Sequence, residues 1–158
     1  MKILEGSRAF RFALFAVALV VLGGCATSGA KFTEFQPTAP RLDPADARIY
    51  VYRTMGPGAA VQPKVNINGQ TVGTAVPNGF FFVDRKPGPY EISTTTEVER
   101  KLSLTLDKGE TRYVRLSISM GFFVGHVYPE LVDKAEAEKE IEECRYTGQV
   151  GASLSESK

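Results

Sequence analysis

From residue 48 onward, short segments in which apolar and polar residues alternate follow one another, and turn residues separate them. Successive side chains of a strand point to opposite faces of a sheet, so this two-residue period predicts half-buried β-strands. The alternating segments span residues 48–54, 61–68, 70–75, 90–96, 101–106 and 113–118, and a short apolar segment, residues 80–83, lies among them. About seven or eight short strands, spaced about ten residues apart, are typical of a single antiparallel β-sandwich, and this mainly-β fold is our prediction.

Three local patterns refine this prediction. Asn68-Gly69 predicts a type I′ hairpin, because both central residues of that turn need a positive φ. Residues 80–83 are apolar at every position, which predicts a strand covered on both faces. Residues 121–132 contain Gly125 and Pro129, so we expect either two short irregular strands or one bulged strand there.

The hydrophobic period changes near the C-terminus. Asp133 and Glu136 form a capping pattern, and Ala137, Ile141 and Cys144 share one face of a helix. We therefore expect one C-terminal helix from residue 134 to about residue 145, which completes a domain of residues 48–145. Residues 146–158 are expected to be a disordered tail.

The first residues have the layout of a signal peptide. A basic head with Lys2, Arg8 and Arg11 precedes an apolar run, residues 12–22, which ends in small residues. This run is shorter than the roughly 20 residues that a membrane-spanning helix needs. Residues 1–24 are therefore predicted to be a signal peptide that is cleaved off.

The end of this segment, Leu22-Gly23-Gly24-Cys25, resembles the bacterial lipobox. The resemblance implies that a diacylglycerol is attached to the Cys25 thiol, that cleavage occurs before Cys25, and that the new amino group can be acylated. The alternative is an ordinary signal peptide in which Cys25 is incidental. Ala26 follows the cysteine, which in the enterobacterial sorting pattern implies the outer membrane, facing the periplasm of a Gram-negative cell envelope.

Residues 25–47 are rich in Ala, Thr, Ser and Pro and show no hydrophobic period. We interpret them as the lipidated cysteine followed by a flexible tether, which would span on the order of 25 Å. Two aromatic residues in it, Phe32 and Phe35, either dock against the domain or sit at the membrane surface.

Composition and residue counts exclude several functions. Loss of residues 1–24 removes three basic residues and one acidic residue, so the net charge falls from +1 to about −1, and we expect no nucleic acid partner. His126 is the only histidine, and after lipidation Cys144 is the only free thiol. A metal site of the His/Cys kind is therefore not expected, and neither is a cofactor or an enzymatic activity. Cys144 is either a semi-buried helical thiol, the site of an intermolecular disulfide or a reactive site.

Several motifs resemble a family of small Gram-negative lipoproteins, the domain-of-unknown-function family number 2846. The resemblance is carried by Val65-Asn66-Ile67-Asn68-Gly69, by Pro87-Gly88-Pro89-Tyr90-Glu91-Ile92, by Arg48-Ile49-Tyr50-Val51-Tyr52-Arg53 and by Gly109-Glu110-Thr111-Arg112-Tyr113-Val114. The central stretch is also similar to PEGA-type envelope repeats. Both resemblances imply a small β-sandwich of the prealbumin or immunoglobulin-like kind, and neither implies an activity or a site.

The aromatic residues suggest a binding function. They exceed what one sandwich core needs, so we expect a surface that includes Tyr50, Tyr52 and Tyr128; the alternative is that they pack in the core. Such a surface would bind a periplasmic or outer-membrane protein partner by strand addition, or an envelope glycan by stacking. We expect a non-enzymatic lipoprotein that is held on the membrane by its lipid. The folded domain would bind one of these two partners.

Overall fold

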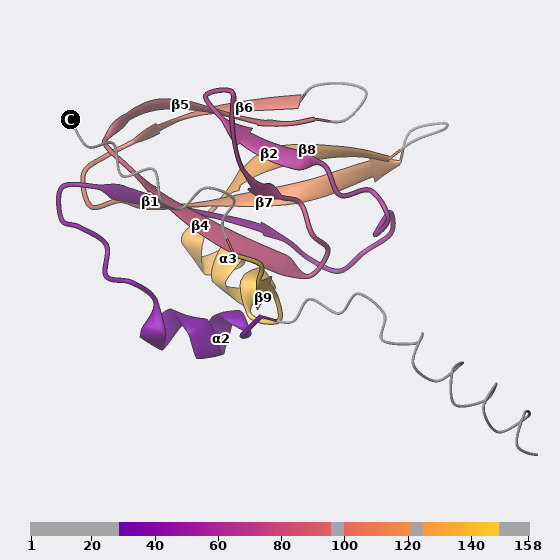
Figure 1. The fold of residues 1–158 in the computed structure, drawn as a ribbon, viewed down its shortest axis with the longest axis horizontal. Coiled ribbons are helices and arrows are strands. Elements are labelled where there is room, and N and C mark those ends of the chain that lie inside the picture. The colour runs from indigo at the N-terminus through magenta and orange to yellow at the C-terminus, as the bar shows by residue number, and fades with distance from the viewer. Residues whose placement is uncertain (1–28, 96–99, 121–124, 149–158) are drawn as a thin grey trace, which may run out of the picture.

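The computed structural model describes residues 29–95, 100–120 and 125–148 of the chain (Figure 1). Its strands are β1 (Ala47–Arg53), β2 (Lys64–Ile67), β3 (Gln70–Thr74), β4 (Gly79–Arg85), β5 (Gly88–Thr94), β6 (Arg100–Leu106), β7 (Thr111–Met120), β8 (Gly125–Val132) and β9 (Arg145–Tyr146). The helices are α2 (Phe32–Phe35), α3 (Lys134–Ile141) and the 3-10 helix η1 (Gln36–Thr38). Among the described residues, no helix is long and apolar enough to span a membrane.

The strands form two sheets that pack face to face, which confirms the predicted mainly-β sandwich. Sheet A has five strands in the order β8-β7-β1-β4-β9, and sheet B has four in the order β3-β2-β5-β6. The expectation of purely antiparallel pairing is wrong for sheet A. There β1 is antiparallel to β4 but parallel to β7, and β4 is parallel to β9. A two-residue hydrophobic period reports which residues face inward and carries no information on the direction of the neighbouring strand.

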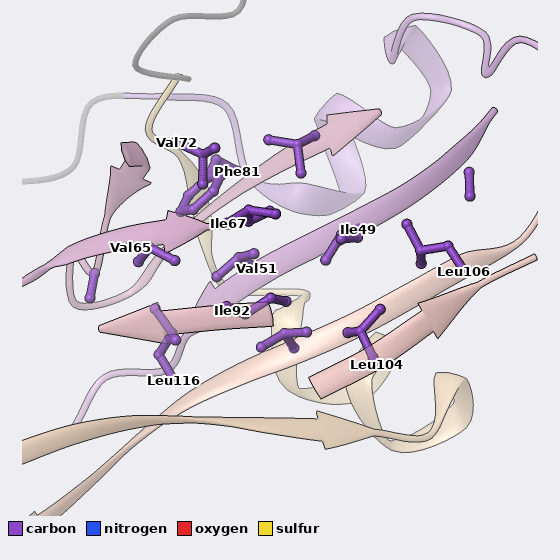
Figure 2. Close-up of a cluster of buried hydrophobic side chains, with 14 of the residues drawn as sticks. Ile49, Val51, Val65, Ile67, Val72, Phe81, Ile92, Leu104, Leu106 and Leu116 are labelled. Atoms are coloured by element: carbon purple, nitrogen blue, oxygen red, sulfur yellow. The ribbon is translucent and has the colours of Figure 1, made fainter. Parts of the chain in front are cut away.

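The space between the sheets is the main core (Figure 2). Ile49 and Val51 of β1 point into it, opposite Val65 and Ile67 of β2. All four side chains are at most 2% exposed. The polar residues of β2, Lys64 and Asn66, alternate with Val65 and Ile67 and are less buried. The remaining buried members come from both sheets: Ala47, Val72, Ala75, Phe81, Val83, Ile92, Leu104, Leu106, Val114, Leu116 and Val127. The alternation in the sequence therefore predicted the inward-facing residues of these strands.

A second core lies on the other face of sheet A, where α2 and α3 cover it (Figure 1). Phe80 and Phe82 of β4 point into this second core, while Phe81 and Val83 point into the main core. The prediction of a strand covered on both faces is thus confirmed. The domain has three layers, in the order sheet B, sheet A, helices.

The turn prediction is also confirmed, whereas the irregular or bulged strand predicted for residues 121–132 is wrong for residues 125–132; residues 121–124 lie outside the described residues. Asn68 and Gly69 have φ values of 48° and 79°, and they join Ile67 to its partner Gln70. By contrast, β8 is one continuous strand that pairs with β7 from Val132 to Gly125 without a register shift. Pro129 is accommodated because β8 is the edge strand of sheet A, where a missing N–H breaks no ladder.

The C-terminal helix begins where predicted and ends earlier. Asp133 is the N-cap of α3, but its side chain makes no capping hydrogen bond, and the Glu136 side chain binds Arg115. The helix ends at Ile141, and Tyr146 pairs with Phe80 in β9. The expectation of a disordered tail is therefore wrong for residues 146 and 147, which are bound to β4, and residues 149–158 lie outside the described residues.

Candidate functional site

The predicted aromatic surface does not exist as a surface. Tyr50 is 6% exposed and Tyr52 is 1% exposed, because α2 and α3 cover the face of sheet A that carries them. The third residue, Tyr128 on β8, is half-buried. None of the chain's tyrosines, all of which lie in the described ranges, is fully exposed. The predicted lipidation residues, Leu22, Gly23, Gly24 and Cys25, lie outside the described residues.

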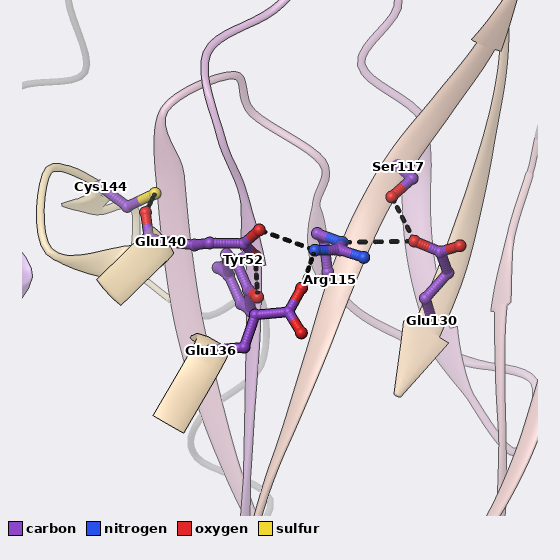
Figure 3. Close-up of polar contacts among 7 residues, drawn as sticks. All are labelled: Tyr52, Arg115, Ser117, Glu130, Glu136, Glu140 and Cys144. Atoms are coloured by element: carbon purple, nitrogen blue, oxygen red, sulfur yellow. Dashed lines mark hydrogen bonds and ion pairs between the residues drawn. The ribbon is translucent and has the colours of Figure 1, made fainter. Parts of the chain in front are cut away.

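The most concentrated group of charges lies between sheet A and α3 (Figure 3). Arg115 of β7 reaches toward the helix and places Nη1 2.7 Å from Glu140 and 2.9 Å from Glu136. Its Nε lies 3.3 Å from Glu130 on the neighbouring strand β8. The Arg115 cluster, which comprises Arg115, Glu130, Glu136 and Glu140, therefore links one arginine to three carboxylates from two elements. It joins α3 to the sheet.

Hydroxyl groups complete this cluster. Tyr52 donates a hydrogen bond of 2.6 Å to Glu140, and Ser117 donates one to Glu130. Burial and the hydrogen bond to Glu140 raise the pKa of Tyr52, so it stays protonated as a donor. Burial lowers the pKa of Arg115, but its three carboxylate partners outweigh this and raise it overall. Every charged group in the cluster has a partner, so the cluster stabilises the packing of α3 on sheet A.

A groove of about 310 Å³ borders this cluster. It is lined by Arg112, Lys134 and Arg115 and by the carboxylates of Glu110, Asp133 and Glu136. Arg112 lies 2.7 Å from Glu110, and Lys134 lies 3.8 Å from Glu138. Arg112 and Arg115 pair with carboxylates of the groove itself, and Lys134 pairs with Glu138 outside it, so the three cations that line the groove are all in ion pairs.

No described helix or strand covers the outer face of sheet B, and this face is polar. Its shallow groove, about 490 Å³, is lined by Asn68, Glu91, Ser103 and Thr105 together with Tyr90. The Tyr90 hydroxyl donates to the Lys86 carbonyl, and the ring packs partly against the main core. This face offers hydrogen-bonding groups, and its one aromatic ring is not an exposed platform on which a sugar could stack.

Cys144 and His126 lie in different segments of the fold. Cys144 follows α3 and is fully buried in the second core, where its thiol lies 3.5 Å from the Arg53 carbonyl. His126 is half-buried near the start of β8, and its Nδ1 makes no hydrogen bond to any described residue. Within residues 29–95, 100–120 and 125–148, no group of His, Cys, Asp and Glu is placed to hold a metal ion.

Cys144 predicts a loss of stability in alkaline solution. Burial, then the charges of Glu140 and Glu143, raise the pKa of its thiol from 9.0 to about 12. The protonated thiol therefore contributes its full stabilisation of the fold below about pH 9. This contribution is lost as the pH rises from about 9 to about 12, because in that range only the unfolded chain forms the thiolate. Above about pH 9 the free energy of unfolding should fall by about 1.4 kcal/mol per pH unit, as measured by urea titration.

The Cys144→Ala variant provides the control for this prediction. It should lack the decline between about pH 9 and pH 10, below the range in which the unfolded chain ionises Tyr52 and Tyr113. An equal decline in both proteins would assign the alkaline effect to other groups.

Comparison with protein families identifies the chain. The family described as "Protein of unknown function (DUF2846)" matches residues 43–127, which is more than half of the sequence. The chain belongs to this family. No curated protein matches it. The expected family is therefore confirmed, while the similarity to PEGA-type repeats stays a prediction.

In this DUF2846 protein, the motifs shared with the family have structural roles. The backbone N–H of Asn68 donates to the Glu91 carbonyl, and its side-chain oxygen accepts from the Glu91 N–H, both at 2.9 Å. This double hydrogen bond joins the Asn-Gly turn to β5. At the ends of β1, Arg48 binds Asp84 through two hydrogen bonds, and Arg53 donates to backbone carbonyls. The motifs thus hold turns and strand ends together.

The folded body also includes residues 29–47, so the prediction of a flexible tether is wrong for this part of the segment, most of which precedes the residues that the family model matches. The Phe32 N–H donates to the Cys144 carbonyl, and the Ala30 carbonyl accepts from Tyr146. Phe32 is 2% exposed, and the Phe35 ring stacks on Tyr146 at 4.5 Å. The two phenylalanines bury enough apolar surface to dock a segment whose composition alone indicates a linker. The docking alternative for Phe32 and Phe35 is thus the correct one.

Proposed function

We propose that this DUF2846 protein is a lipid-anchored, non-enzymatic component of the bacterial cell envelope that holds a protein-binding sandwich beside the membrane. The observation that carries the proposal is the Leu22-Gly23-Gly24-Cys25 sequence, which stands immediately ahead of the docked segment that begins at Gly29. Two or three acyl chains on Cys25 hold a protein on a bilayer essentially permanently, at about 0.8 kcal/mol per buried methylene. Ala26 after the cysteine favours the outer membrane, with the domain in the periplasm.

A binding role rather than an enzymatic one is supported by the charged groups. The Arg115 cluster uses its carboxylates in ion pairs and hydrogen bonds, so none is poised as a general acid or base. Cys144 is buried and its pKa is raised, which is the opposite of an activated nucleophile. The polar outer face of sheet B, with its shallow groove, is the surface that we assign to a partner.

The anchor is tested by replacing Cys25 with serine. The Cys25→Ser variant should move from the membrane fraction to the soluble periplasmic fraction, because the oxygen of serine cannot form the thioether. Cys144→Ser is the matched control, since it also removes one thiol and should remain in the membrane fraction. If Cys25→Ser still sediments with membranes after a high-salt wash, the lipid is not the anchor.

The second candidate function is an envelope glycan-binding module. The burial of Tyr50 and Tyr52 disfavours it, because exposed coplanar rings are what sugar stacking requires. A pull-down with the purified protein separates the two candidates. Retention on purified peptidoglycan without any protein partner would favour the glycan function and contradict the first proposal.

A further inference from the structure

The docked N-terminal segment limits how the domain can be placed against a membrane. Residues 29–32 run beside β9, where Lys31 forms an antiparallel bridge with Arg145. The Gly29 carbonyl accepts a hydrogen bond of 3.0 Å from the Arg145 side chain, and the Ala30 carbonyl accepts one of 2.9 Å from the Tyr146 N–H. The segment therefore extends the β9 side of sheet A.

Gly29 is held tightly at this position. A Cβ atom on Gly29 would lie 1.8 Å from the backbone oxygen of Tyr146, so no other residue fits without breaking the contact. Three residues later, the Phe32 ring meets the Tyr50 and Phe80 rings edge-on, at 5.5 and 5.3 Å. The first described residue of the chain is thus fixed to the folded body.

The anchor is close to this fixed point. Cys25 precedes Gly29 by four positions, and a fully extended chain covers at most about 14 Å over that length. We infer that in the lipid-anchored protein the edge made of residues 29–31, β9 and α2, here called the anchor edge, faces the lipid bilayer. This inference rests on the proposed lipidation of Cys25, and it replaces a free tether with a fixed orientation.

The groups on the anchor edge are suited to a headgroup layer. Thr33, Glu34 and Gln36 are exposed, and Lys31 pairs with Glu143 at 2.6 Å. This edge is polar and its charges are mixed, so it can lie against headgroups without inserting, and the acyl chains rather than a basic patch provide the attraction.

The opposite side of the domain faces away from the bilayer. Strand β6 packs against β8, which is at the other edge of sheet A from β9. Figure 1 shows α2 and β6 on opposite sides of sheet A. The open face of sheet B is therefore presented to the periplasm, and a partner must come within one domain length of the membrane to reach it.

Site-specific fluorescence quenching tests this orientation. The full lipidated protein is reconstituted into vesicles of phosphatidylethanolamine and phosphatidylglycerol that contain nitroxide-labelled headgroups. One variant carries a fluorophore at Thr33→Cys on α2, and the matched variant carries it at Ser103→Cys on β6; both positions are exposed. Cys144 is fully buried, so the unmutated protein measures the labelling background. We expect loss of fluorescence at position 33 and none at position 103.

A longer tether supplies the second control. Insertion of about 20 Gly and Ser residues between Thr27 and Ser28 adds on the order of 25 Å of reach. The difference in quenching between positions 33 and 103 should then disappear. Equal quenching at both positions without the insertion, in vesicles that carry the protein through flotation, overturns the orientation alone. Failure of the protein to float with the vesicles overturns both the anchor and the orientation.

Discussion

Replacing Phe81 with alanine is expected to lower the free energy of unfolding by about 3–5 kcal/mol. Phe81 is 2% exposed and lies in the main core between the two sheets. Its ring occupies the space beside Gly73 of β3, where a Cβ atom would lie 2.6 Å from the ring. Removal of the ring leaves a cavity that the rigid sheets cannot close. The loss of stability therefore exceeds the free energy of transferring the removed atoms to water. Urea denaturation measures it.

The contact between Phe81 and Gly73 makes this prediction more specific. Gly73→Ala alone should cost about 1–3 kcal/mol, because the new methyl group meets a ring that has no room to move. In the Phe81→Ala background the same substitution should cost little, since the methyl group then enters the cavity. A double-mutant cycle measures this coupling. Gly56→Ala is the control, because nothing lies within 4 Å of its Cβ position. Additive effects of the two substitutions would contradict the contact.

Replacing Arg53 with methionine is expected to lower the free energy of unfolding by about 3 kcal/mol. Arg53 is 3% exposed and donates to the carbonyls of Val61, Ala75 and Gly58, at 2.6, 2.7 and 2.9 Å. Burial lowers its pKa, so relief of the buried charge offsets part of the loss. The larger effect is that the Val61 and Ala75 carbonyls lose their Arg53 donor, whereas the Gly58 carbonyl keeps the Val61 N–H. Each unsatisfied buried acceptor costs about 1–3 kcal/mol.

The control for Arg53 is Arg112→Met. Arg112 also belongs to a family motif, but its side chain is 38% exposed and pairs with Glu110 near the surface. Surface ion pairs contribute at most about 1 kcal/mol, so this substitution should have a small effect. Equal losses for Arg53→Met and Arg112→Met in urea denaturation would show that Arg53 does not stabilise the fold in this way. Increased proteolysis within residues 54–63 should accompany only Arg53→Met, since its donors hold that loop.

The family motifs show how far sequence reasoning could go for this protein. Arg48 and Arg53 flank a strand of alternating residues, and charged residues at strand ends usually face water. Both are buried here, because Asp84 and backbone carbonyls from distant residues supply partners. No local pattern identifies partners that lie on other strands, so the buried roles of the two arginines were not predictable.

The candidate site was predicted least well, for a related reason. Alternation correctly separates Ile49 and Val51 from Tyr50 and Tyr52, because it assigns them to opposite faces of one strand. It contains no information on whether the second face meets water or another layer. The Arg115 cluster was missed for the same reason, because its members lie on β7, β8 and α3 and only the fold brings them together.

The sequence by itself determined the local structure: the strand positions, the Asn68-Gly69 turn and the start of α3. These features depend on backbone preferences and on side-chain periodicity within a few residues. The tertiary structure alone decided the parallel pairing of β1 with β7, the covering of the aromatic face, and the docking of residues 29–35 onto β9. Each of these joins segments that are far apart in the chain, and their stability comes from apolar burial and backbone pairing between partners that no short stretch of sequence can specify.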